Sequence, residues 1–462
     1  MSDLSAIQKL HHYPPCALFE IAAAHARIEP AKHSGTDVNS TPLPEISNPE
    51  PQLAYLLSQY PAVSHTFLRD EIAGMRERGF TVHIASINPP SRSRPLTPEE
   101  QAEASTTRYI KSTPKLKALG FAFKMLFTSP LIFFRGLFAA LRGTGIDLYR
   151  NVYALFYFVE ALLLGEWMHQ KNLRHLHIHF GGAVATVGSI AAQAWKFSYS
   201  LTIHGPDEFF NQNEFRLQEK IRSASFILCV SDYTRSQLMR ISPPEHWDKM
   251  HIARLGVDPA RFPARKPRRI AIPVQIVCIG RLVPDKGQLV LLQACKEVLK
   301  RGQSLLLTIA GDGPDAAMLK NFVSDNQMQD VVHFSGALTH DQAQQLLSEV
   351  DVFALASFAE GIPVALMEAM SVQLAVVATH VCGIPELITN DVEGLLVAPS
   401  SVEQLADALE KLIVDPELRG RLGLEARKRI VAEYKQRRSL DRLAKFFSKQ
   451  AVITEPQEVE TL

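Results

Sequence analysis

The sequence predicts an α/β protein with two doubly wound parallel sheets. Apolar segments of strand length alternate with helical patterns along most of the chain, which indicates parallel strands joined by crossover helices. A length of 462 residues is too great for one ordinary core. A Pro-rich, basic break near 258–273 separates the alternation into two runs, so we expect one domain on each side of it.

The first run contains a buried-strand pattern at 52–58, a helix with Arg69 and Glu71 among its polar positions, and a second strand, FTVHIASI. Its later strands are predicted at HLHIHF (175–180), YSLTIH (199–204) and FILCVS (226–231). The strands of the second run are continuous and apolar, as in a sheet covered on both faces: VQIVCIG, SLLLTIA, VVHFSG, DVFALAS and LAVVAT. Thr339 with Gln342, and Ser400 with Glu403, fit capping boxes at helix starts.

These patterns divide the chain into four segments. We expect an irregular leader over 1–50, an N-terminal domain over 51–260, a C-terminal domain over 261–433, and a C-terminal helix and tail over 434–462. In doubly wound folds, ligands bind at the loops that leave the carboxyl ends of the strands. The loops after the predicted strands are therefore the place to look for a site.

Composition excludes some classes of protein. A net charge of +1 gives no general reason to expect a nucleic-acid partner. The five cysteines lack CxxC spacing, which argues for a reducing compartment and against a disulfide framework or a zinc knuckle: Cys16, Cys229, Cys278, Cys295 and Cys382. We find neither a secretory signal nor 18 consecutive apolar residues, so we expect a cytoplasmic protein.

Three loops predict a site for a phosphorylated ligand. In ASFAEGIPVALMEAM (356–370), Gly361 and Pro363 mark a turn into a helix, whose free N–H groups attract anions. Glu360 lies just before that helix, and Glu368 lies roughly 10 Å from Glu360 along it. This is about the distance from the sugar to the ribose of a nucleotide sugar. The other loops are GRLVPDKG (280–287), with the cations Arg281 and Lys286, and AGDGP (310–314), with Gly311 and Gly313.

Together these motifs resemble glycosyltransferase family 4, a family of the GT-B fold with two Rossmann-like domains that face an interdomain cleft. The resemblance is strongest over about 250–433, where LGVDPARF, THVCGIPELI and EGLLVAP also match. The motifs of the N-terminal half resemble enzymes of bacterial exopolysaccharide assembly, of the colanic-acid type: YPAVSHTFLRDEI (60–72), HIHFGG (177–182) and TIHGPDEF (202–209). His65 departs from this pattern, because the subgroup often has an acidic residue there.

The resemblance implies a role for each matched residue. Arg281 and Lys286 would hold the donor phosphates, with the N–H groups of Ile362 to Val364 completing the cradle. Glu360 would contact the transferred sugar, Glu368 the ribose hydroxyls, and His204 would approach the sugar from the N-terminal domain. The implied catalytic set is His204, Glu360, Arg281 and Lys286, and the implied donor-binding set is Arg281, Lys286, Gly311, Gly313, Glu360, Gly361, Ile362, Pro363, Val364 and Glu368.

The resemblance implies transfer from a nucleotide diphosphate sugar to a saccharide acceptor, lipid-linked in exopolysaccharide assembly, with retention of configuration. We expect no metal cofactor, because no Asp-x-Asp occurs in the chain. Two alternatives remain open: a nucleotide-sugar 2-epimerase of the same architecture, and a non-catalytic subunit of a polysaccharide assembly complex. A dinucleotide-dependent oxidoreductase is disfavoured, because no GxGxxG follows a strand.

Two further features each allow two interpretations. Residues 104–146 contain no acidic residue and interleave cations with phenylalanines, which fits either an anionic membrane surface on the inner face of the plasma membrane or helices packed on the sheet. Nucleic acid is not expected there, because no binding motif accompanies the cations. His175, His177 and His179 share one face of a strand. We favour a structural role for them over a zinc site.

Overall fold

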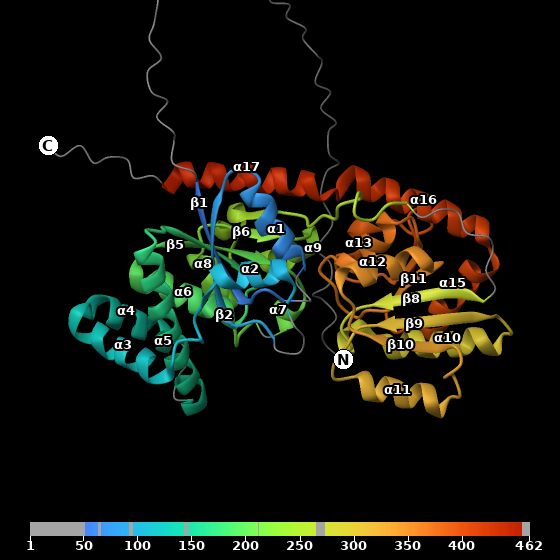
Figure 1. The fold of residues 1–462 in the computed structure, drawn as a ribbon, viewed down its shortest axis with the longest axis horizontal. Helices are drawn as coiled ribbons and strands as arrows, with labels where there is room; N and C mark the ends of the chain where they lie inside the picture. Colours follow the sequence, from blue (N-terminus) through green and yellow to red (C-terminus); the bar gives the residue numbers. More distant parts are fainter. Residues whose placement is uncertain are drawn as a thin grey trace, which may run out of the picture. The chain divides into compact units, whose positions relative to one another are not determined.

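The structure is a computed structural model that describes residues 51–454, apart from 63–65, 92–95, 143–144, 146, 211 and 265–272. The described residues lie in one compact unit, Glu50–Leu462. The predicted leader (1–50), His65 and half of the predicted linker (258–273) therefore lie outside the described residues. The structure confirms the predicted fold class: two parallel sheets, each with helices around it (Figure 1).

The N-terminal half carries a seven-stranded parallel sheet in the order β3-β2-β1-β4-β5-β6-β7. Its strands are β1 (Gln52–Gln59), β2 (Thr81–Asn88), β3 (Arg108–Tyr109), β4 (His175–His179), β5 (Ser198–Ile203), β6 (Ile227–Cys229) and β7 (Met250–Ile252). Its helices are α1 (Thr66–Arg76), α2 (Pro98–Thr106), α3 (Lys115–Thr128), α4 (Pro130–Leu141), α5 (Leu148–Gln170), α6 (Ala183–Trp195), α7 (Asp207–Phe210), α8 (Leu217–Ser223) and α9 (Asp232–Arg240), followed by the 3₁₀ helix η2 (Pro244–Lys249).

The C-terminal half carries a six-stranded parallel sheet in the order β10-β9-β8-β11-β12-β13. Its strands are β8 (Val274–Ile279), β9 (Leu305–Ala310), β10 (Val332–Gly336), β11 (Val352–Leu355), β12 (Ala375–Thr379) and β13 (Leu395–Val397). Its helices are the 3₁₀ helix η3 (Pro284–Lys286), α10 (Gln288–Lys300), α11 (Ala316–Asp325), α12 (His340–Glu349), α13 (Val364–Ser371), α14 (Ile384–Leu387), α15 (Val402–Val414) and α16 (Pro416–Glu433), and α17 (Gln436–Thr454) follows them.

Both sheets reverse their winding direction once. In the N-terminal half the reversal falls between β1 and β4, and in the C-terminal half between β8 and β11. At such a reversal the following crossovers lie on opposite faces, which leaves a crevice at the carboxyl ends of the two strands. The predicted loops 280–287 and 356–363 leave β8 and β11, so they flank the crevice of the C-terminal half.

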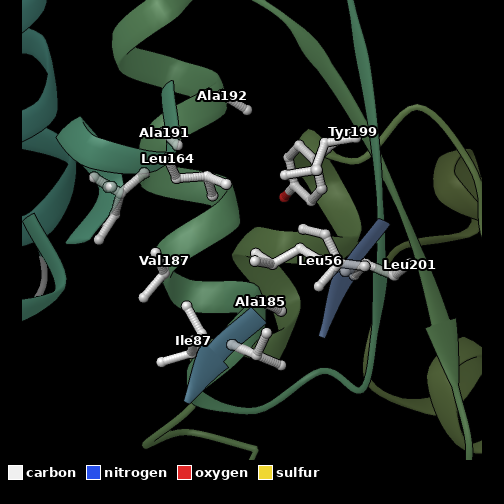
Figure 2. Packing of buried hydrophobic residues seen from close by; sticks show 14 of the residues in the cluster. Leu56, Ile87, Leu164, Ala185, Val187, Ala191, Ala192, Tyr199 and Leu201 are labelled. Atoms are coloured by element: carbon white, nitrogen blue, oxygen red, sulfur yellow. The ribbon is translucent and has the colours of Figure 1, made fainter. Parts of the chain in front are cut away.

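Burial explains why the strands of the C-terminal half read as continuous apolar runs. Every residue of β11 and β12 is buried, as expected for central strands with helices on both faces. In the N-terminal half, α6 lies between the sheet and the outer helices, and its small side chains allow close packing on both sides. Figure 2 shows Ala185 and Ala191 of α6 among Leu56 of β1 and Leu164 of α5.

The N-terminal half has an additional layer of helices. Helices α4 and α5 pack against α6, and α3 packs against α4 and α5 (Figure 1). None of the helices within the described ranges has both the length and the apolar character that crossing a bilayer requires. In the segment 104–146, Phe121 and Phe133 are partly buried against the core, whereas Phe123, Phe127 and Phe134 are exposed. Packing on the core therefore accounts for some of its phenylalanines and leaves others exposed.

Helix α17 follows the C-terminal half in sequence but packs on the N-terminal half (Figure 1). It contacts α1. Its Leu443 and Phe447 join a buried cluster that includes Leu53 and Tyr55 of β1. The end of the chain therefore completes the core of the domain that begins it.

One of the two predicted capping boxes is correct and the other is wrong. Thr339 caps α12 with Gln342 as predicted. Helix α15, however, is capped by Ser401, whose side chain accepts from the N–H of Gln404. Ser400 has φ of +64° and precedes the cap, so the predicted pair Ser400 and Glu403 is shifted by one residue. The sequence allows either Ser400 or Ser401 as the cap of α15. The backbone conformation of Ser400 places the start of the helix at Ser401.

Candidate active site

A cavity of about 550 Å³ lies at the carboxyl ends of β1, β8, β9 and β11, and residues of both halves line it. Its volume is in the usual range for small-molecule sites. Eight of the predicted site residues line it: Arg281, Lys286, Gly311, Glu360, Ile362, Pro363, Val364 and Glu368. His204, Gly313 and Gly361 are not among its lining residues. The three loops predicted from sequence therefore do meet at one place.

Lys286 and Glu360 form an ion pair in this cavity. The Nζ of Lys286 lies 2.6 Å from Oε1 of Glu360. The same carboxylate oxygen accepts a hydrogen bond of 2.7 Å from the hydroxyl of Ser357. Glu360 is only 6% exposed, and a buried carboxylate needs such partners to offset its lost hydration. Two residues to which the resemblance assigns separate roles are thus paired with each other.

Helix α13 begins at Val364, directly after the turn that contains Glu360 and Gly361. The first N–H groups of a helix have no partner within the helix, and they attract anions together with the helix dipole. Pro363 occupies the N-cap position and has no N–H to donate. The predicted cradle of Ile362 to Val364 is therefore reduced to the N–H groups of Ile362 and Val364.

Glu368 lies in the middle of α13 and is 8% exposed. Burial, with a smaller contribution from the charge of Asp70, raises the pKa of Glu368 to about 8. Its Oε1 lies 3.8 Å from Nδ1 of His340, and burial lowers the pKa of that imidazole. At neutral pH the two groups are thus largely an uncharged acid and an uncharged imidazole, which suits hydrogen bonds to neutral hydroxyl groups.

Arg281 stands at the opening of the cavity. Its side chain is 61% exposed, and its guanidinium lies 3.7 Å from the equally exposed carboxylate of Asp207 in the N-terminal half. Pairs this exposed contribute little to stability, because water screens them. The guanidinium can therefore turn towards an anionic ligand at small cost.

Gly361 brings the loop before α13 against His204. A Cβ at Gly361 would lie 1.8 Å from the carbonyl oxygen of His204, so no other residue allows this approach. Gly311 has φ of +150°, and a Cβ there would lie 1.8 Å from the carbonyl oxygen of Gly280. At Gly313 the oxygen of Leu282 is the obstacle, at 2.3 Å. These glycines thus permit close packing of the protein's own loops.

His204 ends a buried chain of polar groups. Its Nε2 lies 3.0 Å from Nδ1 of His179. The other ring nitrogen of His179 lies 3.3 Å from Oε1 of Glu71, and that oxygen accepts a 2.8 Å hydrogen bond from the hydroxyl of Tyr55. The chain runs from α1 and β1 through β4 to the end of β5. His179 holds the ring of His204, and Glu71 lies next to His179 as a close acidic group, although Nε2 of His179 makes no hydrogen bond.

A structural role for the histidines of β4 fits the contacts better than a metal site does. His177 is fully buried, and its two ring nitrogens lie 2.7 Å and 2.8 Å from the hydroxyls of Ser200 and Thr202. Burial lowers its pKa well below the ordinary value, so the ring is neutral. Glu71, His177 and His179 do offer ligand atoms within 4.8 Å of one another. Both nitrogens of His177, however, already have hydroxyl partners.

Several residues of the site are not indicated by the three loop motifs. His340 and Asp70 set the environment of Glu368, and Glu71 and His179 hold His204. Some signals were present: His340 directly follows the predicted helix cap Thr339, and both acidic residues lie in the segment YPAVSHTFLRDEI. No local pattern, however, indicates which strand or helix from the other half will lie opposite.

Two doubly wound sheets with a ligand-sized cavity at their strand ends are the architecture of the GT-B fold. Comparison with known proteins agrees. Residues 264–429 match the family model "Glycosyl transferases group 1". Anabaena Alr3699/HepE, solved in complex with UDP and glucose, has the same fold with a TM-score of 0.66 at 16% identity, over 86% of this chain and 99% of that one.

The relatives specify the type more closely. The chain is 28% identical over 370 residues to the putative colanic acid biosynthesis glycosyltransferase WcaL of Escherichia coli, covering 78% of this chain and 89% of the relative. It is 25% identical over 413 residues to the amylovoran biosynthesis glycosyltransferase AmsK of Erwinia amylovora, covering 87% of this chain and 100% of the relative. The resemblance drawn from the motifs is confirmed: the chain matches the glycosyltransferase family model over 264–429, has the GT-B fold, and is similar to glycosyltransferases of exopolysaccharide biosynthesis. The epimerase and non-catalytic alternatives are not favoured.

Proposed function

We propose that the protein binds a nucleotide diphosphate sugar in the 550 Å³ cavity and transfers the sugar to a saccharide acceptor, lipid-linked in exopolysaccharide assembly. The observation that carries this proposal is the convergence of Arg281, the Lys286–Glu360 pair and the start of α13 at one cavity. The similar fold of a protein solved with UDP and glucose supports it.

In this proposal the donor lies along α13. Arg281, Lys286 and the N–H groups of Ile362 and Val364 hold the diphosphate, and Glu368 receives the ribose hydroxyls. Lys286 then exchanges part of its contact with Glu360 for a phosphate oxygen. The carboxylate of Glu360, still held by Ser357, becomes available to the hydroxyls of the sugar.

We infer that transfer retains the anomeric configuration and needs no metal ion. The bond from the anomeric carbon to the phosphate oxygen breaks while the acceptor oxygen bonds to the same face, and the acceptor proton passes to the leaving phosphate. Catalysis then depends on stabilising negative charge on that phosphate, which Arg281, Lys286 and the helix end can do. The absence of Asp-x-Asp from the sequence agrees with this inference, and an unchanged rate in EDTA would test it.

His204 would contact the sugar from the N-terminal half. Its backbone carbonyl lies against Gly361, so the residue stands beside the turn that carries Glu360. The buried chain through His179 to Glu71 would hold the ring in one orientation and one tautomer. Neither His179 nor Glu71 would touch the donor, so both act as positioning residues for His204.

We place the reaction in the cytoplasm, at the inner face of the plasma membrane. The described cysteines are free thiols, and Cys229, Cys278 and Cys295 are buried, as expected for a reducing compartment. A lipid-linked acceptor would hold the growing saccharide at that surface. No further partner is needed for transfer, and none of the proposed contacts involves nucleic acid.

A thermal-shift screen of nucleoside diphosphates and their sugars tests donor binding. A true donor raises the melting temperature, because a ligand at 100 times its Kd stabilises the folded state by about 2.7 kcal/mol. Incubation of the stabilising donor with and without acceptor then tests the reaction. Stabilisation by no nucleotide, a diphosphate bound away from Pro363, or epimerised donor without acceptor would each overturn the proposal.

A further inference from the structure

The outer helices of the N-terminal half have two apolar faces instead of one. Helix α3 buries Ala118, Ala122 and Met125 against its neighbours. Its opposite face exposes Leu116, Leu119, Phe123 and Phe127, again at helical spacing, with Leu116 85% and Phe127 69% exposed. A surface helix normally carries polar residues on that side. The second apolar face of α3 therefore has no counterpart in the described fold.

The neighbouring helices repeat this arrangement. Helix α4 buries Gly136, Ala139 and Ala140 and exposes Leu131, Phe134 and Phe138. The first turns of α5 expose Leu148, Tyr149, Val152, Tyr153, Leu155 and Phe156. We call the exposed apolar residues of the three helices, together with Leu141 at the end of α4, the α3–α5 surface. On α3 and α4 the fully buried residues are mostly small, and large apolar residues lie on the exposed face.

The α3–α5 surface holds most of the exposed large apolar side chains among the described residues: fourteen lie in it and eight elsewhere. Those elsewhere are scattered, as Met318, Val414 and Val431 illustrate. Single exposed apolar residues are normal, but a contiguous group of this kind marks an interaction site.

Cations surround the apolar residues. Lys115, Lys117, Lys124, Arg135 and Arg142 are exposed on α3, on α4 or at its end, and no acidic residue occurs between 104 and 146. Lys111 lies 3.7 Å from the partly buried Glu160, and Arg150 is 3.3 Å from Asp147, so these two acids face cations. The exposed Glu214 lies near Tyr149. The surface thus combines exposed aromatic rings with an excess of positive charge.

We propose that the α3–α5 surface binds an anionic lipid bilayer, with its aromatic rings among the lipid head groups and its cations on lipid phosphates. A second copy of the chain fits less well, because a two-fold interface would place each cluster of cations against the other. The surface lies on the membrane without spanning it, since α3 has 14 residues and extends about 21 Å. The proposal deepens the proposed use of a lipid-linked acceptor.

Flotation of the full chain with vesicles tests the surface. We expect binding to phosphatidylcholine vesicles that contain phosphatidylglycerol, weaker binding to phosphatidylcholine alone, and release by salt. The variant Phe127→Ser/Phe134→Ser/Phe138→Ser should lose at least about tenfold in vesicle affinity, since each phenylalanine loses a buried ring. The matched control is Val414→Ser/Leu424→Ser/Val431→Ser, which replaces three exposed apolar residues of the C-terminal half and should bind like the wild type.

Charge reversal by Lys117→Glu/Lys124→Glu/Arg135→Glu should abolish the preference for phosphatidylglycerol. Melting temperatures show that each variant is folded. No wild-type binding at low salt, or equal losses in both serine variants, would overturn the proposal. So would a wild-type dimer that the phenylalanine variant converts to a monomer, without vesicle binding. The flotation experiment measures lipid binding alone. The proposed lipid surface can therefore fail this test while the proposed nucleotide site passes its own, and the nucleotide site can fail while the lipid surface passes.

Discussion

The two halves have the same strand order in their sheets but differ in their outer surfaces. The C-terminal half surrounds its sheet with helices whose exposed apolar residues are scattered, and it contributes most of the cavity's charged residues. The N-terminal half adds the α3–α4–α5 layer beyond α6, with the outward apolar surface (Figure 1). The comparison teaches that a common topology fixes where a cavity forms, whereas the surfaces around the sheet determine what else each half contacts.

The largest expected effect lies in the C-terminal half. Lys286→Ala and Glu360→Ala should each lower glycosyl transfer by about 100-fold or more, because each change removes one member of the ion pair that the proposal places on the donor. Initial rates with the donor identified by thermal shift measure this loss.

The control for that prediction is Lys300→Ala, which removes a cation of the same half that pairs only at the surface with Glu297. Its rate should match the wild type. If both cavity variants kept near-normal rates while folded, the cavity would not be the donor site, and the assignment of chemistry to the C-terminal half would fail.

The second prediction concerns stability and pH. The pKa of Glu368 is raised from 4.5 to about 8, so the folded state holds a proton that the unfolded state releases. The stability contributed by this proton is fully present below pH 4.5 and is lost as pH rises through 8. At pH 8.5 the free energy of unfolding of Glu368→Gln should therefore exceed that of the wild type by an amount on the order of a few kcal/mol. The variant should melt at a higher temperature there, and the difference should shrink towards pH 5.

The exposed Glu349 of the same half provides the matched control, since Glu349→Gln replaces a carboxylate at the surface. Its melting temperature should follow that of the wild type across the pH range. A constant difference between Glu368→Gln and wild type from pH 5 to 8.5 would show that Glu368 is ionised throughout.

Much of the fold could be predicted because strands covered on both faces are recognisable in isolation. VQIVCIG and DVFALAS are apolar throughout, and they became β8 and β11. The position of the site followed from the same logic, because parallel strands end at one edge. Arg281, Lys286 and Glu360 could be grouped before any coordinates, since each follows such a strand.

The pairing of side chains could not be predicted, because it depends on contacts between distant segments. Nothing in the sequence places Asp70 near Glu368, or Glu71 beside His179. The α3 helix shows a second limit. Periodicity reveals apolar faces, but when both faces are apolar it does not say which one is buried.

The third prediction tests whether the N-terminal half supports the chemistry. Glu71→Gln keeps the shape of the side chain but removes the charge next to His179, so His204 loses its fixed tautomer. We expect kcat to fall by about tenfold and its pH profile to shift, with an unchanged Kd for the nucleoside diphosphate, because Glu71 does not line the cavity. Glu77→Gln, at an exposed position beyond α1, serves as the control. An equal loss of nucleotide affinity would indicate a structural role instead.

The smallest expected effect lies where the two halves meet. The carboxylate of Glu386 in α14 accepts hydrogen bonds of 2.9 Å and 2.8 Å from the N–H groups of Asp232 and Tyr233, at the start of α9. One half thus caps a helix of the other, which favours a carboxylate because the helix N-terminus is positive. Glu386→Ala should lower the free energy of unfolding by about 1 kcal/mol, the usual cost of a lost cap.

Hydrogen exchange distinguishes this local effect from a general one. Because the two amides lose their acceptor, they should exchange faster in Glu386→Ala, whereas amides of the central strand β12 should be unaffected. Glu403→Ala, an exposed change at the start of α15, should alter neither. Faster exchange throughout both sheets would mean that Glu386 stabilises the contact between the two halves and does not act on α9 alone. The stabilities of the two halves could then not be treated separately.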